Sequence, residues 1–225
     1  MWCVAELNEE YIAKMEDVLA LYEKPFKADE PVICLDEKPV SLHDDVRPCR
    51  PGRPGHIARR DNEYKRCGTA NIFAVVEPKA GRHLNCATPN RSAAQFAQVV
   101  QRLVAAYPFA RKIHLVMDNL NIHCRKSLTD HLGNEQGRYT WSRLKVHYTP
   151  KHGSWLNQAG IEISLFSREC LGLRRIPSLR DLSRESQAWN RTMNRDHIVI
   201  NWKFTSKKAR QKFNYKRNNF RLSET

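Results

Sequence analysis

Pro31-Val-Ile-Cys-Leu-Asp36 and Ile113-His-Leu-Val-Met-Asp118 decide the fold, because each is a short apolar run that ends on an aspartate. Short apolar runs of this length, partly β-branched, are typical of buried strands. We therefore predict two strands of one sheet, each of which delivers a carboxylate at its C-terminal end.

The segments around these runs predict a mixed α/β domain. Further strands are expected over 69–77, 81–88 and 145–148, with a hairpin turn at 78–81, so the first three strands form an antiparallel meander. Helices are expected over 8–22, 125–132, 156–170 and 179–195, and over the apolar stripe from Phe96 to Val104. This order predicts an RNase H-like mixed five-stranded sheet with helices on both faces.

The charge of the chain indicates a polyanionic partner. The net charge is +14, which is unusual for a metabolic enzyme and points to nucleic acid. The segment Arg168–Thr225 holds 15 Lys and Arg against 5 acidic residues. Aromatic residues that interleave with these cations suit either stacking on bases or a place in the core: Trp189, Trp202, Phe204, Phe213, Tyr215 and Phe220.

A second basic segment, Arg47-Pro-Cys-Arg-Pro-Gly-Arg-Pro-Gly55, is predicted to be an exposed loop because its prolines and glycines oppose regular structure. The seven cysteines include no CxxC pair and no zinc-finger spacing, which favours free thiols in a reducing compartment. No apolar run has the length of a membrane span, and the acidic start lacks a signal-peptide pattern. We expect a cytoplasmic protein with no membrane partner.

Asp36 and Asp118 are the candidate metal ligands. If their strands are neighbours, the two carboxylates can converge on one or two Mg²⁺ ions, which favour oxygen ligands and support phosphodiester chemistry. The alternative is that each aspartate only ends a strand and caps the following turn.

Three motifs carry a resemblance to a known family. They are Leu35-Asp-Glu-Lys38, Met117-Asp-Asn-Leu-Asn-Ile-His123 and His147-Tyr-Thr-Pro-Lys-His-Gly-Ser-Trp-Leu-Asn157. Over nearly its whole length the chain resembles the IS630-type transposases, a bacterial branch related to the Tc1/mariner group of DDE superfamily endonucleases. The resemblance implies cut-and-paste transposition with Mg²⁺ or Mn²⁺, and DNA cleavage and strand transfer at inverted repeats and TA targets. It also implies a possible homodimer on double-stranded DNA and a nucleoid-associated location.

The third carboxylate of that family is a Glu three residues after the Asn of the Trp-Leu-Asn motif, a position that Gly160 occupies here. Glu162 is the nearest acidic residue and the candidate substitute. Two residues turn a helix by about 200°, so Glu162 is expected to point away from the face of position 160. We therefore expect weak or absent activity.

Residues in three basic or motif segments are candidate DNA contacts: Arg50, Arg53, Lys151, His152, Trp155, Asn157, Arg174 and Arg175. His123 and His152 could contact phosphate or carry protons, or be ordinary hydrogen-bonding residues. For Trp155, burial in the core is the alternative to stacking on DNA.

The expected organisation is a helical lead-in over 1–30, an RNase H-like catalytic core over 31–176 and a basic helical extension over 177–225. The acidic first helix is not expected to read DNA, so the family's helix-turn-helix modules would have to come from another reading frame or be lost. An active transposase domain and a catalytically dead, truncated DNA-binding remnant both remain open. A cellular RNase H-like nuclease such as a junction resolvase is a more distant alternative.

Overall fold

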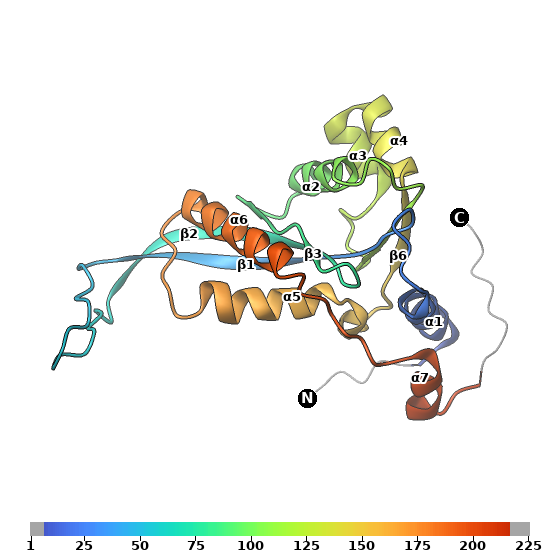
Figure 1. Cartoon of the computed structure of the whole chain (residues 1–225). Helices are drawn as coiled ribbons and strands as arrows, with labels where there is room; N and C mark the ends of the chain where they lie inside the picture. Colours follow the sequence, from blue (N-terminus) through green and yellow to red (C-terminus); the bar gives the residue numbers. More distant parts are fainter. Residues whose placement is uncertain (1–6, 217–225) are drawn as a thin grey trace.

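A computed structural model describes residues 7–216, and its centre is one mixed sheet of six strands (Figure 1). The strand order is β3-β2-β1-β5-β6, and β4 also pairs with β2. The strands are β1 (Val32–Asp45), β2 (Tyr64–Glu77), β3 (Arg82–His83), β4 (Cys86–Thr88), β5 (Ile113–Met117) and β6 (Leu144–Tyr148).

The helices follow the predicted order with two additions. They are α1 (Glu9–Glu23), α2 (Ala93–Ala105), α3 (Arg125–Leu132), α4 (Asn134–Ser142), α5 (Ala159–Leu165), α6 (Leu179–Arg195) and α7 (Ser206–Phe213). A short 3₁₀ turn, Ser154–Leu156, precedes α5, and a π-helical segment, Phe166–Leu171, continues it. Helices α4 and α7 were not predicted.

The strand directions confirm the RNase H-like topology. Strands β1, β2 and β3 pair antiparallel, whereas β1 with β5 and β5 with β6 pair parallel. The expected strand over 81–88 is split into β3 and β4, which is why the sheet has six strands. Asn85 causes the break, because its backbone N–H donates to Asn190 and its carbonyl accepts from Ser186, both on α6.

Two layers of helices cover the sheet through alternating side chains of its strands. Ile33, Leu35 and Met117 point into a core shared with α2, and the apolar stripe of α2 is buried there as predicted. Cys34 and Val116 point to the other face and pack with α1 and with Ala159 of α5. The helix predicted near the N-terminus is therefore part of this core, and Asn8 caps it by accepting from the Tyr11 N–H at 2.8 Å.

Strand β1 is much longer than the predicted 31–35. Its parallel pairing with β5 ends at Cys34, but its antiparallel pairing with β2 continues to Asp45, so the two strands leave the body as a long arm (Figure 1). The basic loop forms the tip of this arm, where the backbone of Arg50 pairs antiparallel with that of Arg59, and the backbone of Arg53 with that of His56. A third apolar cluster, which includes Phe166 and Trp189, covers the base of the arm with the π-helical segment and α6.

None of the helices within residues 7–216 is long and apolar enough to cross a membrane.

Candidate functional site

Asp36 and Asp118 occupy equivalent places on adjacent parallel strands. Cys34 of β1 pairs with Val116 of β5, and each aspartate comes two residues later. Side chains two residues apart share a face, and neighbouring strands lie about 4.8 Å apart. Both carboxylates therefore emerge on the face that packs α1 and α5, where the two strands part.

Burial and mutual repulsion shape the ionisation of this pair. Burial raises the pKa of Asp36 to about 6, and the charges of Glu37 and Asp118 act in the same direction. The pKa of Asp118 is instead lowered, chiefly because His123 donates a hydrogen bond to it. Two carboxylates that disfavour each other's charge form a site that a cation would stabilise.

His123 lies between two acidic side chains. Its Nδ1 is 2.7 Å from Oδ1 of Asp118, and its Nε2 is 2.8 Å from Oε1 of Glu37. Burial alone would lower the pKa of His123, but the bonds to Asp118 and Glu37 raise it to about 10. The ring is therefore a buried imidazolium that bridges both carboxylates.

Glu37, Asp118 and His123 also offer three potential ligand atoms within 4.8 Å of one another. However, the two acids bond to opposite nitrogens of the ring, so one ion cannot replace both contacts at once. We interpret the group as an ion triad that fixes Asp118 beside Asp36. Glu37 lies in the motif Leu35-Asp-Glu-Lys38, but the resemblance assigned a role only to Asp36 and Asp118.

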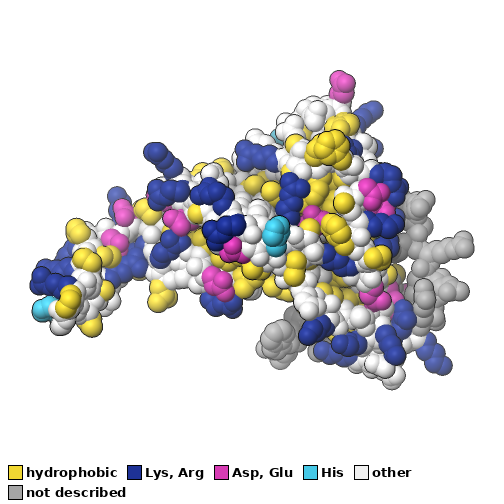
Figure 2. All heavy atoms as spheres, viewed as in Figure 1, with side chains coloured by type: hydrophobic (Ala, Val, Ile, Leu, Met, Phe, Trp, Pro, Cys, Tyr) yellow, Lys and Arg dark blue, Asp and Glu magenta, His cyan; other side chains and the backbone are white. Residues whose placement is uncertain are grey.

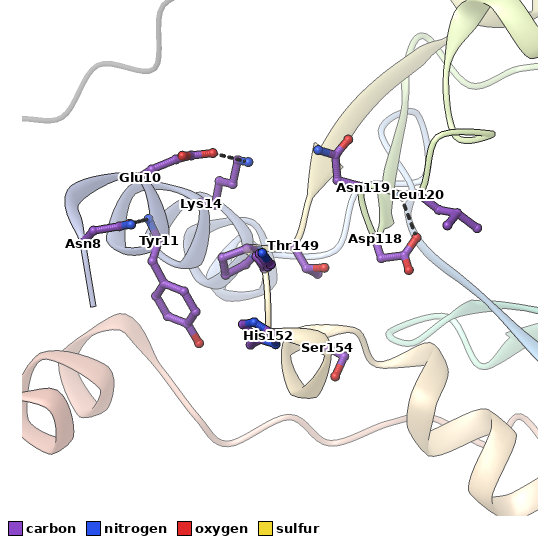
Figure 3. Close-up of a pocket in the computed structure, with 12 residues that line it drawn as sticks. Asn8, Glu10, Tyr11, Lys14, Asp118, Asn119, Leu120, Thr149, His152 and Ser154 are labelled. Atoms are coloured by element: carbon purple, nitrogen blue, oxygen red, sulfur yellow. Dashed lines mark hydrogen bonds and ion pairs between the residues drawn. The ribbon is translucent and has the colours of Figure 1, made fainter. Parts of the chain in front are cut away.

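A cavity of about 980 Å³ opens in front of Asp118. Figure 3 shows Glu10 and Lys14 of α1 on one side of it and Asp118 and Asn119 on the other. Lys151 and His152 also line this cavity, so these two candidate DNA contacts lie close to the carboxylate edge. Helix α1 thus forms a wall of the site, which the sequence did not indicate.

Gly160 lies in the first turn of α5, on the helix that covers this face of the sheet. A Cβ atom added to Gly160 would meet nothing within 4 Å. The position expected to hold the third carboxylate is therefore open, and it has not been filled by a neighbouring side chain.

The side chain of Glu162 does not have the position that the catalytic role considered for it would require. Its side chain is 0% exposed and accepts hydrogen bonds from His83 (2.8 Å), Asn85 (2.5 Å) and Trp189 (2.7 Å). Because its oxygens are held by β3, the 84–85 break and α6, Glu162 joins the sheet to the C-terminal part of the chain. The structure does not bring it together with Asp36 and Asp118, as the helical geometry predicted.

His83 completes this buried network. Its Nδ1 faces Glu162, and its Nε2 faces the carbonyl of Ile198 at 2.9 Å. A ring nitrogen that faces an oxygen acceptor must donate, so His83 carries both protons. Burial opposes this charge, but Glu162 and the Ile198 carbonyl raise the pKa of His83 above its usual value.

Two of the candidate DNA contacts are engaged inside the protein. Arg175 donates to Asp45 at 2.6 Å and to the carbonyls of Glu63 and Asp61, each at 2.8 Å, which ties together the two strands of the arm. Asn157 is 4% exposed and donates to the carbonyl of Leu35 at 2.8 Å, which holds the start of α5 against β1. The polar atoms of both side chains are therefore engaged in hydrogen bonds within the protein.

The other candidate contacts are more accessible. Arg50 and Arg53 are exposed at the tip of the arm, where Figure 2 shows dark blue side chains gathered. Arg174 is paired with Glu185 at 2.9 Å and remains half-exposed. Trp155 is 40% exposed, donates to the Tyr11 hydroxyl, and contacts Phe204 and Phe213 edge to face or tilted, so core packing accounts for only part of it.

The aromatic residues of the basic C-terminal segment pack inside the protein. Trp189 is buried, Trp202 meets Tyr22 edge to face, and Phe204, Phe213 and Tyr215 pack against the cluster around α1. This favours the core interpretation over stacking on bases; Phe220 lies outside the described residues. Six cysteines within residues 7–216 are free thiols, as expected.

Comparisons with known proteins agree with this architecture. Residues 31–183 match the family model described as DDE superfamily endonuclease. A Mos1 transposase paired-end complex with left transposon end is 16% identical over 88% of this chain and 61% of that one, with a TM-score of 0.54. The Mos1 strand transfer complex gives the same identity over 87% of this chain and 59% of that one, with a TM-score of 0.54.

The chain therefore spans about three fifths of the Mos1 chains it matches, and at this identity the likeness establishes a shared fold. No curated protein sequence matches the chain. The family match covers more than half of the chain and includes both aspartates of the site. The protein belongs to the DDE superfamily endonucleases and has the fold of the Tc1/mariner-related transposases.

Proposed function

We propose that this chain is the catalytic part of an IS630-type transposase, which cleaves DNA phosphodiester bonds and transfers strands in cut-and-paste transposition. The observation that carries this proposal is the matched register of β1 and β5, which sets Asp36 and Asp118 side by side on one face. The part of the chain that carries both aspartates matches a family of endonucleases, and the motifs that resemble the IS630-type transposases surround both residues.

A divalent cation fits this pair of residues. Two carboxylates supply the hard oxygen ligands that Mg²⁺ and Mn²⁺ prefer, and burial, together with the charges of Glu37 and Asp118, raises the pKa of Asp36, so a bound cation would favour its ionised form. Asp36 and Asp118 would hold the ion, which when bound supplies charge stabilisation and activation of the attacking hydroxyl. Structures of the Mos1 mariner paired-end complex with Mn and with Mg support this choice.

Gly160 limits the proposed reaction. The family pattern requires a third carboxylate at this position, and Glu162 is held in a buried network that excludes it from that role. We therefore expect the chain to bind one cation better than two and to cleave DNA weakly or not at all.

Double-stranded DNA is the proposed partner, in the form of transposon ends and a TA target, with a homodimer assembled on it. Lys151 and His152 line the cavity beside Asp118 and would meet the phosphates of a strand that enters it. Arg50 and Arg53 at the arm tip extend the basic surface away from this cavity.

The decisive experiment restores the third carboxylate. Gly160→Glu and the matched control Gly160→Ala both fill the open space and both remove a helix glycine, at a gain of about 1 kcal/mol in helix stability. In a plasmid nicking assay with Mg²⁺ or Mn²⁺, the Glu variant should cleave and the Ala variant should not. Adding Asp118→Ala to the Glu variant should abolish the cleavage.

A second candidate is a catalytically silent DNA-binding remnant, which the same glycine favours. Cleavage by the unmodified chain that Asp118→Ala abolishes would exclude the remnant. Equal inactivity of Gly160→Glu and Gly160→Ala, with DNA binding intact, would contradict the proposed placement of the third carboxylate and favour the remnant.

A further inference from the structure

We propose that His123 is a positioning residue of the cation site, which holds the Asp118 carboxylate in place by bridging it to Glu37. This inference rests on the proposed function, because the site it serves is the Asp36–Asp118 cation site. His123 would act through Asp118, and Glu37 would act through His123.

The ring of His123 is held at both nitrogens. Its Nδ1 is 2.7 Å from Oδ1 of Asp118 and 3.0 Å from the main-chain carbonyl oxygen of the same residue, and its Nε2 is 2.8 Å from Oε1 of Glu37. A ring that donates in two opposite directions cannot rotate without losing a charge-assisted bond, and such bonds are the stronger kind. The Asp118 carboxylate is thus anchored through one oxygen, which also accepts from the Leu120 N–H at 3.2 Å.

Packing fixes the ring as firmly as its hydrogen bonds. His123 is 1% exposed, and its ring lies 4.7 Å from the ring of Phe96 on α2. The Tyr148 hydroxyl donates to the His123 carbonyl at 2.6 Å, and the His123 N–H donates to the Leu120 carbonyl at 2.8 Å. The turn from Asp118 to His123 therefore closes on itself and against β6.

Glu37 supplies an anchor from outside the cation site. It follows Asp36 in β1, so its side chain points to the opposite face of the sheet, where it is 4% exposed. His123 connects the two faces at the place where β1 and β5 separate. Asp118 sits at the end of a strand and is 48% exposed, so without this bridge its carboxylate would have rotational freedom.

Burial excludes a direct role for His123 toward DNA. A ring that is 1% exposed and bonded at both nitrogens cannot contact a phosphate or exchange a proton with a substrate. This settles the alternatives that the sequence left open for His123 in favour of hydrogen bonding within the protein.

The test measures Mn²⁺ affinity by electron paramagnetic resonance, so it does not depend on DNA cleavage. Replacing a side chain that orients a metal ligand commonly weakens metal binding about 10- to 100-fold. We expect His123→Ala to weaken Mn²⁺ binding by about tenfold or more on this scale. His131→Ala, which removes an exposed histidine of α3, is the matched control and should bind Mn²⁺ like the unmodified chain.

The conservative variants separate positioning from charge and packing. His123→Asn keeps a donor near the Nδ1 position that faces Asp118, so it should recover part of the lost affinity, whereas His123→Gln, with its donor toward Glu37, should not. Glu37→Gln should weaken binding less than His123→Ala, and the double variant should be no weaker than His123→Ala alone. A role in packing alone would give Asn and Gln the same effect.

The outcomes distinguish the two proposals. If His123→Ala remains folded and binds Mn²⁺ as tightly as the unmodified chain, or more tightly, the positioning role is wrong. If His123→Ala does not fold, His123→Asn, His123→Gln and Glu37→Gln take its place, and the positioning role is wrong if all three bind Mn²⁺ as tightly as the unmodified chain. If Asp36→Asn and Asp118→Asn leave Mn²⁺ binding unchanged, or if neither the unmodified chain nor Gly160→Glu binds Mn²⁺, the cation site itself is wrong and the positioning role fails with it.

Discussion

Two buried or half-buried acidic residues of this chain, Asp36 and Glu162, lie in opposite electrostatic surroundings. Asp36 is partly buried beside other negative charge, and its pKa is raised to about 6. Glu162 is completely buried but is surrounded by three donors, one of which is the charged ring of His83. Ionised Asp36 therefore costs folding free energy, whereas the Glu162 carboxylate satisfies three buried donors.

The first prediction concerns Asp36→Asn. Because the folded pKa lies above the ordinary value of 3.8, ionised Asp36 destabilises the fold increasingly as pH rises from about 4 to about 6. At neutral pH the Asn variant should raise the free energy of unfolding by about 1 to 3 kcal/mol, and near pH 4 the gain should vanish. Urea denaturation of both chains at the two pH values measures this, and a gain that does not change with pH would contradict it.

The second prediction concerns Glu162→Gln. The substitution keeps the shape but leaves the buried cation of His83 without its counterion, so it should lower the free energy of unfolding by about 2 to 4 kcal/mol near pH 6. Since the folded pKa of His83 is raised, this contribution is present below about pH 6.5 and is lost as pH rises through the folded pKa. The difference between the two chains should therefore shrink at alkaline pH.

Thermal denaturation across this pH range tests the prediction, with Glu169→Gln on the exposed side of the neighbouring helix as a control. An equal loss of stability at all pH values would show that the charge of His83 is not involved. The same variant should leave Mn²⁺ binding unchanged, because the Glu162 oxygens are held by His83, Asn85 and Trp189 and not by the groups around Asp36 and Asp118.

At the scale of elements, Arg175 holds the chain at the place where β1 and β2 pass into the loop at the tip of the arm. Arg175 bonds to Asp45 of β1 and to the carbonyls of Asp61, Asn62 and Glu63 on the returning chain. A guanidinium can reach several acceptors at once because its donors are arranged in a fixed fork, whereas an ammonium group cannot.

The third prediction is that Arg175→Lys loosens this arm without unfolding the body. Hydrogen exchange of the amides of 46–63 should become faster, and proteolysis in this segment should increase, while the amides of β5 and α2 keep their protection. The control is Arg180→Ala, which removes an exposed arginine of α6. Unchanged exchange at 46–63 would mean that the contacts of Arg175 do not hold the tip loop.

The elements that could be predicted from the sequence are those that bury a regular apolar stripe. Strand β5 is five buried residues in a row, and every residue of the α2 stripe faces the core. Helix α4 was not predicted because it packs through Gly137. A Cβ added to Gly137 would lie 2.6 Å from the Thr129 backbone, and such a close backbone contact leaves no apolar pattern in the sequence. The full length of β1 was not predicted because its outer half pairs with β2 alone and does not form a continuous buried apolar run.

The site was predictable to a similar degree. The prediction that Asp36 and Asp118 lie together followed from their positions at the ends of two apolar runs. The two runs pair in parallel, which brings their ends to the same edge of the sheet. The bridge from Glu37 to His123 joins residues 86 positions apart in sequence, and no pattern in either segment signals it. The roles of Arg175 and Asn157 also depend on long-range contacts, which is why basic or motif character alone suggested DNA contact.

At the scale of the whole molecule, the basic surface is spread over parts that lie far apart. Exposed arginines cluster at the arm tip (Figure 2), while the cavity near Asp118 combines Lys14, Lys151 and His152 with acidic side chains. Contacts with phosphates release counterions, so each one adds to the salt dependence of DNA binding.

The fourth prediction is that Arg50→Ala with Arg53→Ala weakens non-specific DNA binding and reduces the slope of log K against log salt by about 2. The matched control, Arg125→Ala with Lys126→Ala, removes the same charge from exposed positions on α3. Fluorescence anisotropy with a short duplex at several salt concentrations measures both. If the two double variants change the slope equally, net charge rather than the arm determines binding.

The open space around Gly160 bears on the history of this gene. When a catalytic side chain is lost, neighbouring residues can later grow into the gap, and the loss then becomes difficult to reverse. Here no neighbouring atom lies within 4 Å of a Cβ added to Gly160. Some glycine codons differ from a glutamate codon in a single base, so wherever the gene carries such a codon, one transition would supply the glutamate that the proposed site requires, and its Cβ would meet no neighbouring atom within 4 Å.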